Sequence, residues 1–182
     1  MTARARHPDD PCSRHFHFRD LLYCGETYAR LVSEGSAIDN RPSVDDSWEA
    51  IASLAAFILD PVVDRFGPAN LTYGFASPAL TRNIPGRIDS SRDQHAAHES
   101  NRTGKRICIR GGAAVDFAVA TISSEVARFI RSSLPFDRIY FYGDNRPLHV
   151  SWSTTPAQEL WVLETKNGRR FPRRPRPEDR LG

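Results

Sequence analysis

The hydrophobic period changes near residue 70, and no other feature of the sequence constrains the fold as much. Up to that point apolar residues recur every three or four positions, which is the spacing of a helix that buries one face. Beyond it apolar runs are short and rich in aromatic and β-branched residues, as in strands. Helices that come first and strands that follow predict an α+β fold with an antiparallel sheet and the N-terminal helices packed on one side.

Two helices are expected before the change. A short amphipathic helix is predicted over residues 19–33, where apolar side chains gather near one helical face. A longer helix is predicted from Asp46, with a kink at Pro61 and an end at Gly67, because proline lacks a backbone donor and glycine favours helix ends. A third helix is expected later in the chain and ends at Pro135.

Five short apolar segments are predicted to form strands. They span residues 71–75, 113–119, 137–142, 148–152 and 160–165, the last as an edge strand. Between the first two lies the stretch 77–112, which has almost no periodicity and is rich in polar residues and glycine. A connection of this length in a compact domain is usually functional or mobile.

The composition is that of a globular protein. Of the 182 residues 40% are hydrophobic, enough for the core of one domain, and no apolar stretch approaches the roughly 20 residues of a membrane span. The three cysteines lack the spacing of a disulfide framework or a C-x-x-C metal site. Residues 1–14 contain no recognisable export signal. These features predict a cytoplasmic protein that does not contact a membrane.

The net charge of +3 is unevenly distributed. Residues 166–182 hold seven of the 25 basic side chains, whereas residues 1–165 carry 18 basic and 20 acidic ones. We therefore divide the chain into a domain over residues 1–165 and a Pro/Arg-rich tail over residues 166–182. The tail is expected to be extended and solvated, because proline cannot continue a helix or join a central strand. Its charge could attract nucleic acid or another anionic polymer, or serve solubility alone.

Two of the predicted strands contain a polar side chain that is costly to bury. Asp116 interrupts the apolar run 113–119, and His149 lies inside a later apolar run. A carboxylate in such a strand needs a partner, a hydrogen bond or a metal ion. Because side chains alternate along a strand, Asp116 points away from Val115 and Phe117, to the side of two alanines that leave room for an ion.

Histidines in the long polar connection supply further candidates. His95 and His98 both lie there, and either can join Asp116 and His149 as a metal ligand. Two imidazoles and one carboxylate suit a catalytic zinc ion, which takes three protein ligands and keeps a fourth position open. Ordinary hydrogen-bonded histidines are the alternative. Cys108 is either a further soft ligand or a packed thiol.

Ordered motifs extend this pattern over much of the chain. They read Asp39-Asn-Arg-Pro42, Leu59-Asp-Pro-Val-Val-Asp-Arg-Phe-Gly67, Tyr73-Gly-Phe-Ala-Ser-Pro-Ala-Leu80, Asp93-Gln-His95, Gly112-Ala-Ala-Val-Asp116-Phe117, Phe136-Asp-Arg-Ile139 and Leu148-His149-Val-Ser151. With these motifs the chain resembles, over residues 18–152, the zinc carboxypeptidases of the D-Ala-D-Ala peptidase and Hedgehog-like fold group. That group includes phage endolysins and vancomycin-resistance dipeptidases. The resemblance implies an α+β domain whose zinc ligands are His95, Asp116 and His149.

The chain departs from the family pattern at two places that concern ligand and substrate binding. The spacer between His95 and Gly112 is far longer than in the family, so His98 competes with His95 as the ligand. Ala76 stands where the family has an arginine, which removes the cation expected to hold either a substrate carboxylate or the polarised carbonyl. Arg82, a few residues further on, is the candidate replacement.

The general base of the expected enzyme is also displaced. The family has an acidic general base shortly before its last histidine. The corresponding position in this chain is near Arg146, which cannot accept a proton at neutral pH. Asp144 and Glu99 are the remaining candidates. The resemblance predicts a zinc metallopeptidase that hydrolyses a small peptide or a peptidoglycan stem peptide. The alternatives are a catalytically altered zinc-binding module of a phage, defence or toxin system, and a nucleic-acid binder that acts through the tail.

Overall fold

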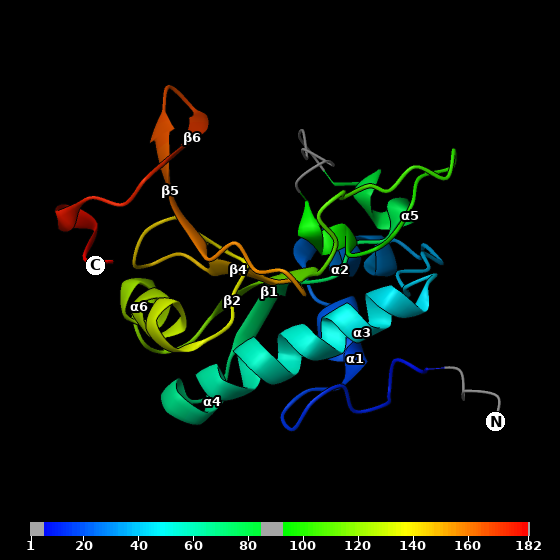
Figure 1. Cartoon of the computed structure of the whole chain (residues 1–182). Coiled ribbons are helices and arrows are strands. Elements are labelled where there is room, and N and C mark those ends of the chain that lie inside the picture. Colours follow the sequence, from blue (N-terminus) through cyan, green and yellow to red (C-terminus); the bar gives the residue numbers. More distant parts are fainter. Residues whose placement is uncertain (1–5, 85–92, 182) are drawn as a thin grey trace.

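The structure is a computed structural model that describes residues 6–84 and 93–181. This part of the chain forms a six-stranded sheet in the order β1-β2-β4-β3-β5-β6, with helices packed mainly on one side (Figure 1). The strands are β1 (Asn70–Tyr73), β2 (Ala113–Ala118), β3 (Arg138–Phe141), β4 (Leu148–Trp152), β5 (Glu159–Lys166) and β6 (Arg169–Arg173). The α-helices are α1 (Phe18–Leu22), α2 (Glu26–Ser33), α3 (Asp45–Leu54), α4 (Asp60–Phe66), α5 (Pro78–Thr81) and α6 (Ser123–Ser133).

The longest helical segment follows the predicted pattern. α3 passes through one π-helical turn (Ala55–Leu59) into α4, whose first turn contains Pro61. The widened turn ends two residues before Pro61, which has no backbone N–H to donate and where a kink was expected. Gly67 ends the segment with a φ of +84°, a conformation that glycine adopts without strain. Neither this segment nor any other helix of the described residues is long and apolar enough to span a membrane.

The helix predicted over residues 19–33 is divided in two. α1 ends at Leu22 and α2 begins at Glu26, with Gly25 between them at a φ of +104°. Gly25 also forms an isolated β-bridge with Tyr73. The prediction of one helix was wrong because an apolar pattern does not record a backbone turn that only glycine adopts easily.

The sheet is mixed, so the prediction of an antiparallel sheet is confirmed for four of the five strand pairs and is wrong for one. All neighbouring strands run antiparallel except β3 and β5, which are parallel. The connection 153–158 explains the difference. The end of β4 lies beside Arg138, the first residue of β3. The connection then crosses to the other side of β3, where β5 begins opposite the same residue and runs in the same direction. The predicted edge strand 160–165 is therefore an inner strand, and β6 forms the edge.

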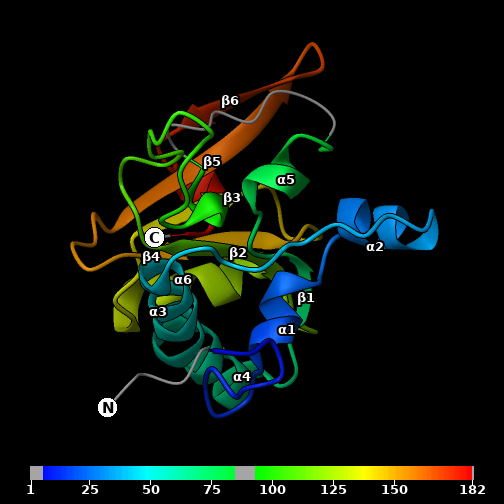
Figure 2. The ribbon, with the colours of Figure 1, turned by 90° about the vertical axis from the view of Figure 1, so that its right-hand side faces the viewer.

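The two faces of the sheet differ in character. α1, α3, α4 and α6 lie on one side of it (Figures 1 and 2), and the main core fills the space between these helices and alternate strand residues. Val115, Ile139 and Val150 are fully buried in this core. The intervening residues, Asp116 and His149 among them, point to the opposite face. We call this the open face, and α5, the stretch 97–112 and the β5–β6 hairpin lie on its side (Figure 1).

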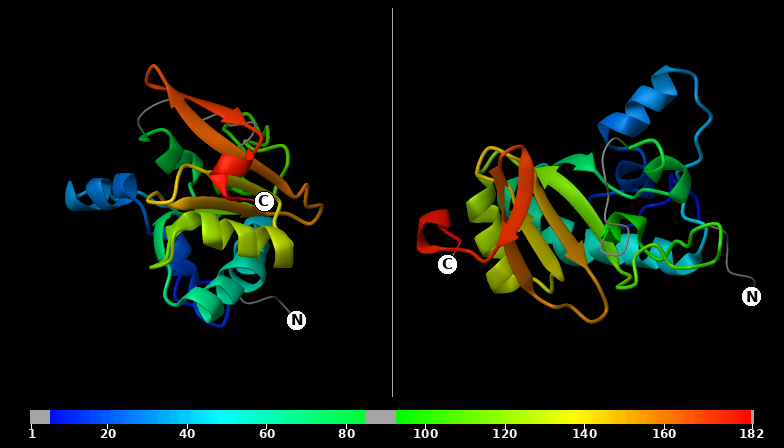
Figure 3. Two further views of the ribbon diagram at one scale, coloured as in Figure 1. Left: turned by 90° about the vertical axis from the view of Figure 1, so that its left-hand side faces the viewer. Right: turned by 90° about the horizontal axis from the view of Figure 1, so that it is seen from above.

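The described part of segment 166–182 folds onto the domain, contrary to the expected solvated tail. β6 pairs with β5 over five residue pairs, and a 3-10 turn (Pro177–Asp179) follows it (Figure 3). Pro172 is tolerated within β6 because that strand is at the edge of the sheet and needs no donor on its outer side. The expectation of an extended tail failed because prolines exclude a central strand but not an edge strand.

Ion pairs and one apolar residue hold this segment in place. Arg173 lies between two carboxylates, with N–O distances of 2.6 Å to both Glu164 and Asp179. Leu181 is fully buried, and its carbonyl oxygen accepts a hydrogen bond from Arg131 of α6. Several of the tail's charges therefore have partners within the domain.

Replacing Leu181 with alanine is expected to lower the free energy of unfolding by about 2–5 kcal/mol, because a fully buried side chain leaves a cavity. Val32→Ala, at a side chain that is 49% exposed, is the control and should change this energy by less than about 0.5 kcal/mol. Urea denaturation followed by fluorescence measures both. Wild-type stability of the Leu181 variant would contradict the folded position of this segment.

Candidate metal centre

Three polar side chains from separate parts of the chain meet on the open face. Asp116 on β2 and His149 on β4 are direct partners in the antiparallel register, so both side chains leave the sheet on the same face. His95 comes from a 3-10 turn (Gln94–Ala96) in the long connection. One ligand atom from each of the three residues lies within 4.8 Å of the other two, and all three side chains are buried or partly buried.

The three ligand atoms form a compact triangle. Asp116 Oδ1 lies 2.7 Å from His149 Nδ1 and 3.4 Å from His95 Nε2, and the two imidazole nitrogens are 3.2 Å apart. Zinc binds nitrogen at about 2.0–2.1 Å in a tetrahedron, which separates neighbouring ligand atoms by about 3.3–3.4 Å. Two edges of the triangle are close to that spacing, and the third is a direct hydrogen bond. The donor set therefore fits a metal ion such as zinc.

Neighbouring groups orient His95. Its Nδ1 lies 2.8 Å from the Gly74 carbonyl oxygen, to which it donates a hydrogen bond, so that Nε2 is the ring nitrogen that faces the cluster. The backbone N–H of Ala76 donates to the His95 carbonyl oxygen, and Asp93 Oδ1 accepts from the His95 N–H. Metal-binding histidines are commonly fixed by such a hydrogen bond from the second ring nitrogen.

The pKa values in the cluster favour a positive charge beside Asp116. Burial acts to lower the pKa of His95, but the hydrogen bond and charge of Asp116 raise it above its usual value. Burial also acts to raise the pKa of Asp116, yet His149 and His95 outweigh it and hold that pKa well below the usual range. The carboxylate therefore stays ionised, and a cation is stabilised at this point.

A buried carboxylate anchors the turn that contains His95. Asp137 is fully buried and accepts hydrogen bonds from Gln94 Nε2 at 2.8 Å, from the Ala157 N–H at 2.7 Å and from two guanidinium nitrogens of Arg110. Gln94 directly precedes His95, and Arg110 lies near the end of the long connection. The two ends of the inserted stretch are thus bound to one carboxylate at the beginning of β3.

His95, and not His98, belongs to the cluster. His98 Nε2 accepts a hydrogen bond from the Gly112 N–H at 3.0 Å, which requires a neutral imidazole with no proton on Nε2. Burial favours this form because it lowers the pKa of His98. Cys108 is buried and is not a member of the cluster. The structure therefore brings together His95, Asp116 and His149.

The two predicted acid–base residues have other partners. Glu99 is only 1% exposed, and its carboxylate accepts hydrogen bonds from the Ser43 N–H and from the hydroxyls of Ser43 and Ser47, at the start of α3. Asp144 accepts a hydrogen bond from the Ser124 N–H at the start of α6. Neither residue belongs to the metal-ligand group. Their catalytic role stays a prediction.

Arg82 lines a groove apart from the cluster. The groove lies between α5 and the inserted stretch, has a volume of about 660 Å³, and contains four cationic side chains, Arg82, Arg102, Lys105 and Arg106. No member of the cluster lines it. A groove with this charge suits an anion, but the structure does not join it to the metal ligands.

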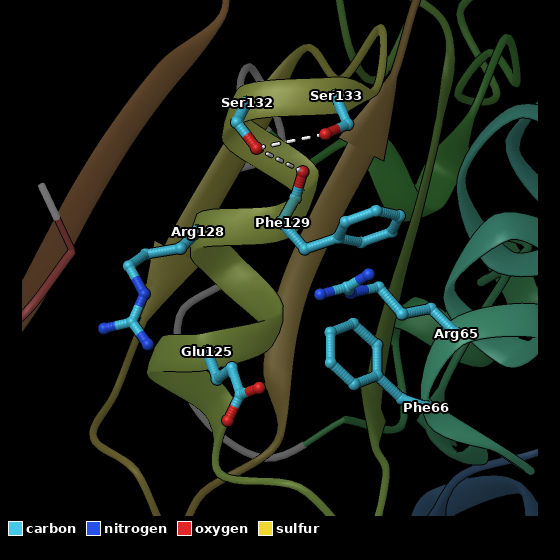
Figure 4. Close-up of a pocket in the computed structure, with 7 residues that line it drawn as sticks. All are labelled: Arg65, Phe66, Glu125, Arg128, Phe129, Ser132 and Ser133. Carbon is cyan, nitrogen blue, oxygen red and sulfur yellow. Dashed lines mark hydrogen bonds between the residues drawn. The ribbon is translucent and has the colours of Figure 1, made fainter.

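Another hollow, of about 510 Å³, lies between α4 and α6 (Figure 4). The guanidinium of Arg65 stands between two rings, 5.4 Å from the centre of Phe66 and 5.1 Å from that of Phe129. The hydroxyls of Ser132 and Ser133, also on its lining, are hydrogen-bonded to each other at 3.0 Å. These groups are partnered within the hollow, and no member of the cluster lines it.

Sequence reasoning missed two tyrosines that flank the cluster. The ring centre of Tyr73 lies 4.1 Å from that of His95, and the ring centre of Tyr140 lies 5.0 Å from that of His149. The Tyr73 hydroxyl is buried without a hydrogen-bond partner in the part of the chain that the structure describes. The position of Tyr140 could have been predicted from the sequence. Strand alternation places its ring on the opposite face from the apolar Ile139, which is the face of His149.

Sequence reasoning placed Asp93 in a motif with His95 but assigned its carboxylate no role. Burial and then the charge of Asp93 raise the pKa of Tyr73, and Asp93 is among the charges that raise the pKa of His95. Asp93 is therefore close enough to act electrostatically on two residues at the cluster. It lies in the aperiodic connection, where no spacing rule distinguishes it from its polar neighbours.

Comparisons with known proteins find no family model that matches the chain, and no significantly similar curated protein or solved structure. The fold and the site define an α+β protein with a mixed sheet and a His–Asp–His group that could hold a metal ion.

Proposed function

We propose that the protein is a zinc-dependent peptidase that hydrolyses a small peptide or a peptidoglycan stem peptide. The triangle of ligand atoms from His95, Asp116 and His149 is the observation that supports this most, because two imidazoles and a carboxylate are ligands of catalytic zinc. When bound, zinc supplies a Lewis acid that polarises a carbonyl and lowers the pKa of water. The substrate class rests on the resemblance of the motifs over residues 18–152.

The chain's own residues orient the site and supply hydrogen bonds. The Gly74 carbonyl fixes the tautomer of His95, and Asp137 anchors the turn through Gln94. The Tyr73 hydroxyl is a donor without a partner in the described structure, beside the His95 ring. Burial raises its pKa, so it stays protonated at neutral pH and can donate to a substrate oxygen.

Asp93 is our candidate for proton transfer. Asp93→Asn keeps an oxygen that can accept the His95 N–H but cannot take up a proton, so hydrolysis should fall by about 10²–10⁴-fold while zinc content is unchanged. Glu99→Gln and Asp144→Asn test the residues predicted from the sequence. If one of them slows hydrolysis and Asp93→Asn does not, proton transfer belongs to that residue.

A zinc-binding module without hydrolytic activity is the alternative. Ala76 provides no cation, and the carboxylate of Glu99 is occupied by hydrogen bonds from two serines. In such a module the Asp93, Glu99 and Asp144 variants should all bind the metal ion, and any partner of the wild type, with unchanged affinity. No turnover should then be measurable in the wild type.

Metal analysis followed by digestion of defined muropeptides tests the proposal. We expect one zinc ion per chain and release of an amino acid or dipeptide from stem peptides that end in D-alanine, detected by mass spectrometry. Chelation should abolish the release, and added zinc should restore it. One zinc ion without hydrolysis supports the binding module, whereas purified protein that neither contains nor binds zinc contradicts both.

A further inference from the structure

The open face continues from the cluster into a row of aromatic side chains. Tyr140 on β3 is opposite His149 on β4, and Trp161 on β5 is opposite Tyr140. Residues opposite one another on neighbouring strands share a face of the sheet. Both rings therefore lie on the open face, together with Asp116 and His149. Tyr142 directly follows β3. It follows Tyr140 by two positions, so strand alternation places its ring on the same face as Tyr140 and His149.

The β5–β6 hairpin and the residue that directly follows it add two cations to this row. Arg170 is opposite Thr165 on β5, and its guanidinium carbon lies 5.1 Å from the centre of the Tyr142 ring. The guanidinium carbon of Arg174 lies 4.0 Å from the centre of the Trp161 ring. Contacts of this kind hold a guanidinium over an aromatic face while its N–H groups stay available to other acceptors.

The two arginines differ in how their charges are neutralised. Arg174 lies 3.6 Å from a carboxylate oxygen of Glu159, whereas Arg170 makes no ion pair within residues 6–84 and 93–181. Arg170 is exposed and lies over the ring of Tyr142, two positions after the tyrosine that is opposite His149. Of these two arginines, Arg170 is therefore the one whose positive charge is available to bind an anion near the cluster.

We propose that Arg170 binds the free carboxylate of the peptide whose peptide bond lies at His95, Asp116 and His149. This inference rests on the proposed function and names the group that the site selects. Arg82, the candidate from the sequence, lines a groove that contains no member of the cluster. A planar guanidinium on an aromatic ring can bind a carboxylate through two N–H groups. The hairpin thus makes the site selective for peptides with a free C-terminus.

Binding of two thiols to the cobalt-substituted full chain tests this inference. Mercaptoacetyl-alanine has a free carboxylate, and its carboxamide is the same molecule without the charge; each gives a thiolate-to-cobalt absorption band on binding. We expect the wild type to prefer the acid. Arg170→Gln should weaken acid binding by about 10- to 100-fold, the range for hydrogen bonds to charged groups, and leave amide binding unchanged.

Three further variants make the result specific. Arg170→Lys keeps the charge without the planar fork and should restore part of the preference. Arg30→Gln removes an exposed arginine of α2 that is paired with Glu34, and should bind both thiols like the wild type. Arg82→Gln is expected to do the same.

The outcomes separate this inference from the proposed function. A cobalt band with equal affinity for acid and amide in the wild type overturns the role of Arg170 and leaves the metal site intact. Loss of the preference in Arg82→Gln but not in Arg170→Gln assigns the carboxylate to the groove instead. Failure of the wild type to bind cobalt rejects the metal centre, and with it both proposals.

Discussion

Purified His149→Ala protein is expected to contain almost no zinc and to hydrolyse no peptide above background. His149 supplies the atom that lies 2.7 Å from Asp116 and 3.2 Å from His95, so its removal leaves two ligands where a structural or catalytic zinc site needs at least three. Loss of a residue that merely orients a ligand already costs about 10–100-fold in metal affinity, and loss of a ligand should cost more. Metal analysis and isothermal titration with zinc measure the effect.

His98→Ala is the matched control for this experiment. It removes the same type of side chain from the same domain, but its ring accepts a hydrogen bond from Gly112 and does not face Asp116. Zinc content in this variant should remain near that of the wild type. Full zinc content and full activity in His149→Ala would end the metal hypothesis, and loss of zinc only in His98→Ala would move the ligand to position 98.

Replacing Asp137 with alanine is expected to destabilise the fold by about 3–5 kcal/mol, because removing one partner of a buried ion pair leaves Arg110 without its countercharge. The carboxylate also accepts from Gln94 and from the Ala157 N–H, and both donors would lose their acceptor. Urea denaturation measures the loss. Since Gln94 precedes a ligand, weaker zinc binding should accompany it.

The effect of Asp137 should depend on pH. Burial acts to raise the pKa of its carboxyl, but hydrogen bonds from Arg110, Ala157 and Gln94 outweigh burial and hold that pKa below its usual value. A depressed carboxyl pKa stabilises the folded state above the unfolded-state value of about 3.9, and this contribution disappears as the pH falls through the folded-state value. The stability difference between wild type and Asp137→Ala should therefore shrink in acid.

Asp64→Ala is the control for the buried carboxylate. Asp64 also pairs with an arginine, Arg14, but its side chain is 45% exposed. Exposed ion pairs contribute about 0–1 kcal/mol, so this variant should be almost as stable as the wild type. Equal losses in the Asp64 and Asp137 variants would mean that the Asp137 network contributes no more than a surface pair.

The positions of the two candidate ligands on strands could be predicted because strand geometry is local. Alternation alone places Asp116 opposite to Val115 and Phe117, and both apolar side chains are buried on the helical side as expected. His149 follows the same rule between Leu148 and Val150. The existence of the long helix and of five strands likewise follows from the apolar period.

Features set by contacts between distant residues could not be predicted. The choice between His95 and His98 depends on the Gly74 carbonyl and the Gly112 N–H, which chain folding brings to the two rings. The tail was interpreted as solvated because its prolines exclude a helix and a central strand, yet it forms an edge strand in which Arg173 pairs with Glu164 of β5. Side-chain period also gives no strand direction, so the parallel pairing of β3 and β5 was missed.

The carboxylate of Asp137 also bears on how the chain tolerates its unusual spacing. Because residues 94 and 110 meet on one anchor, the intervening loop is closed at its base, and its length is uncoupled from the position of the adjacent imidazole. Insertions or deletions at the tip of this loop can therefore accumulate without displacing a metal ligand. Variation in loop length would then change the surface beside the candidate metal ligands before it changes the ligands themselves.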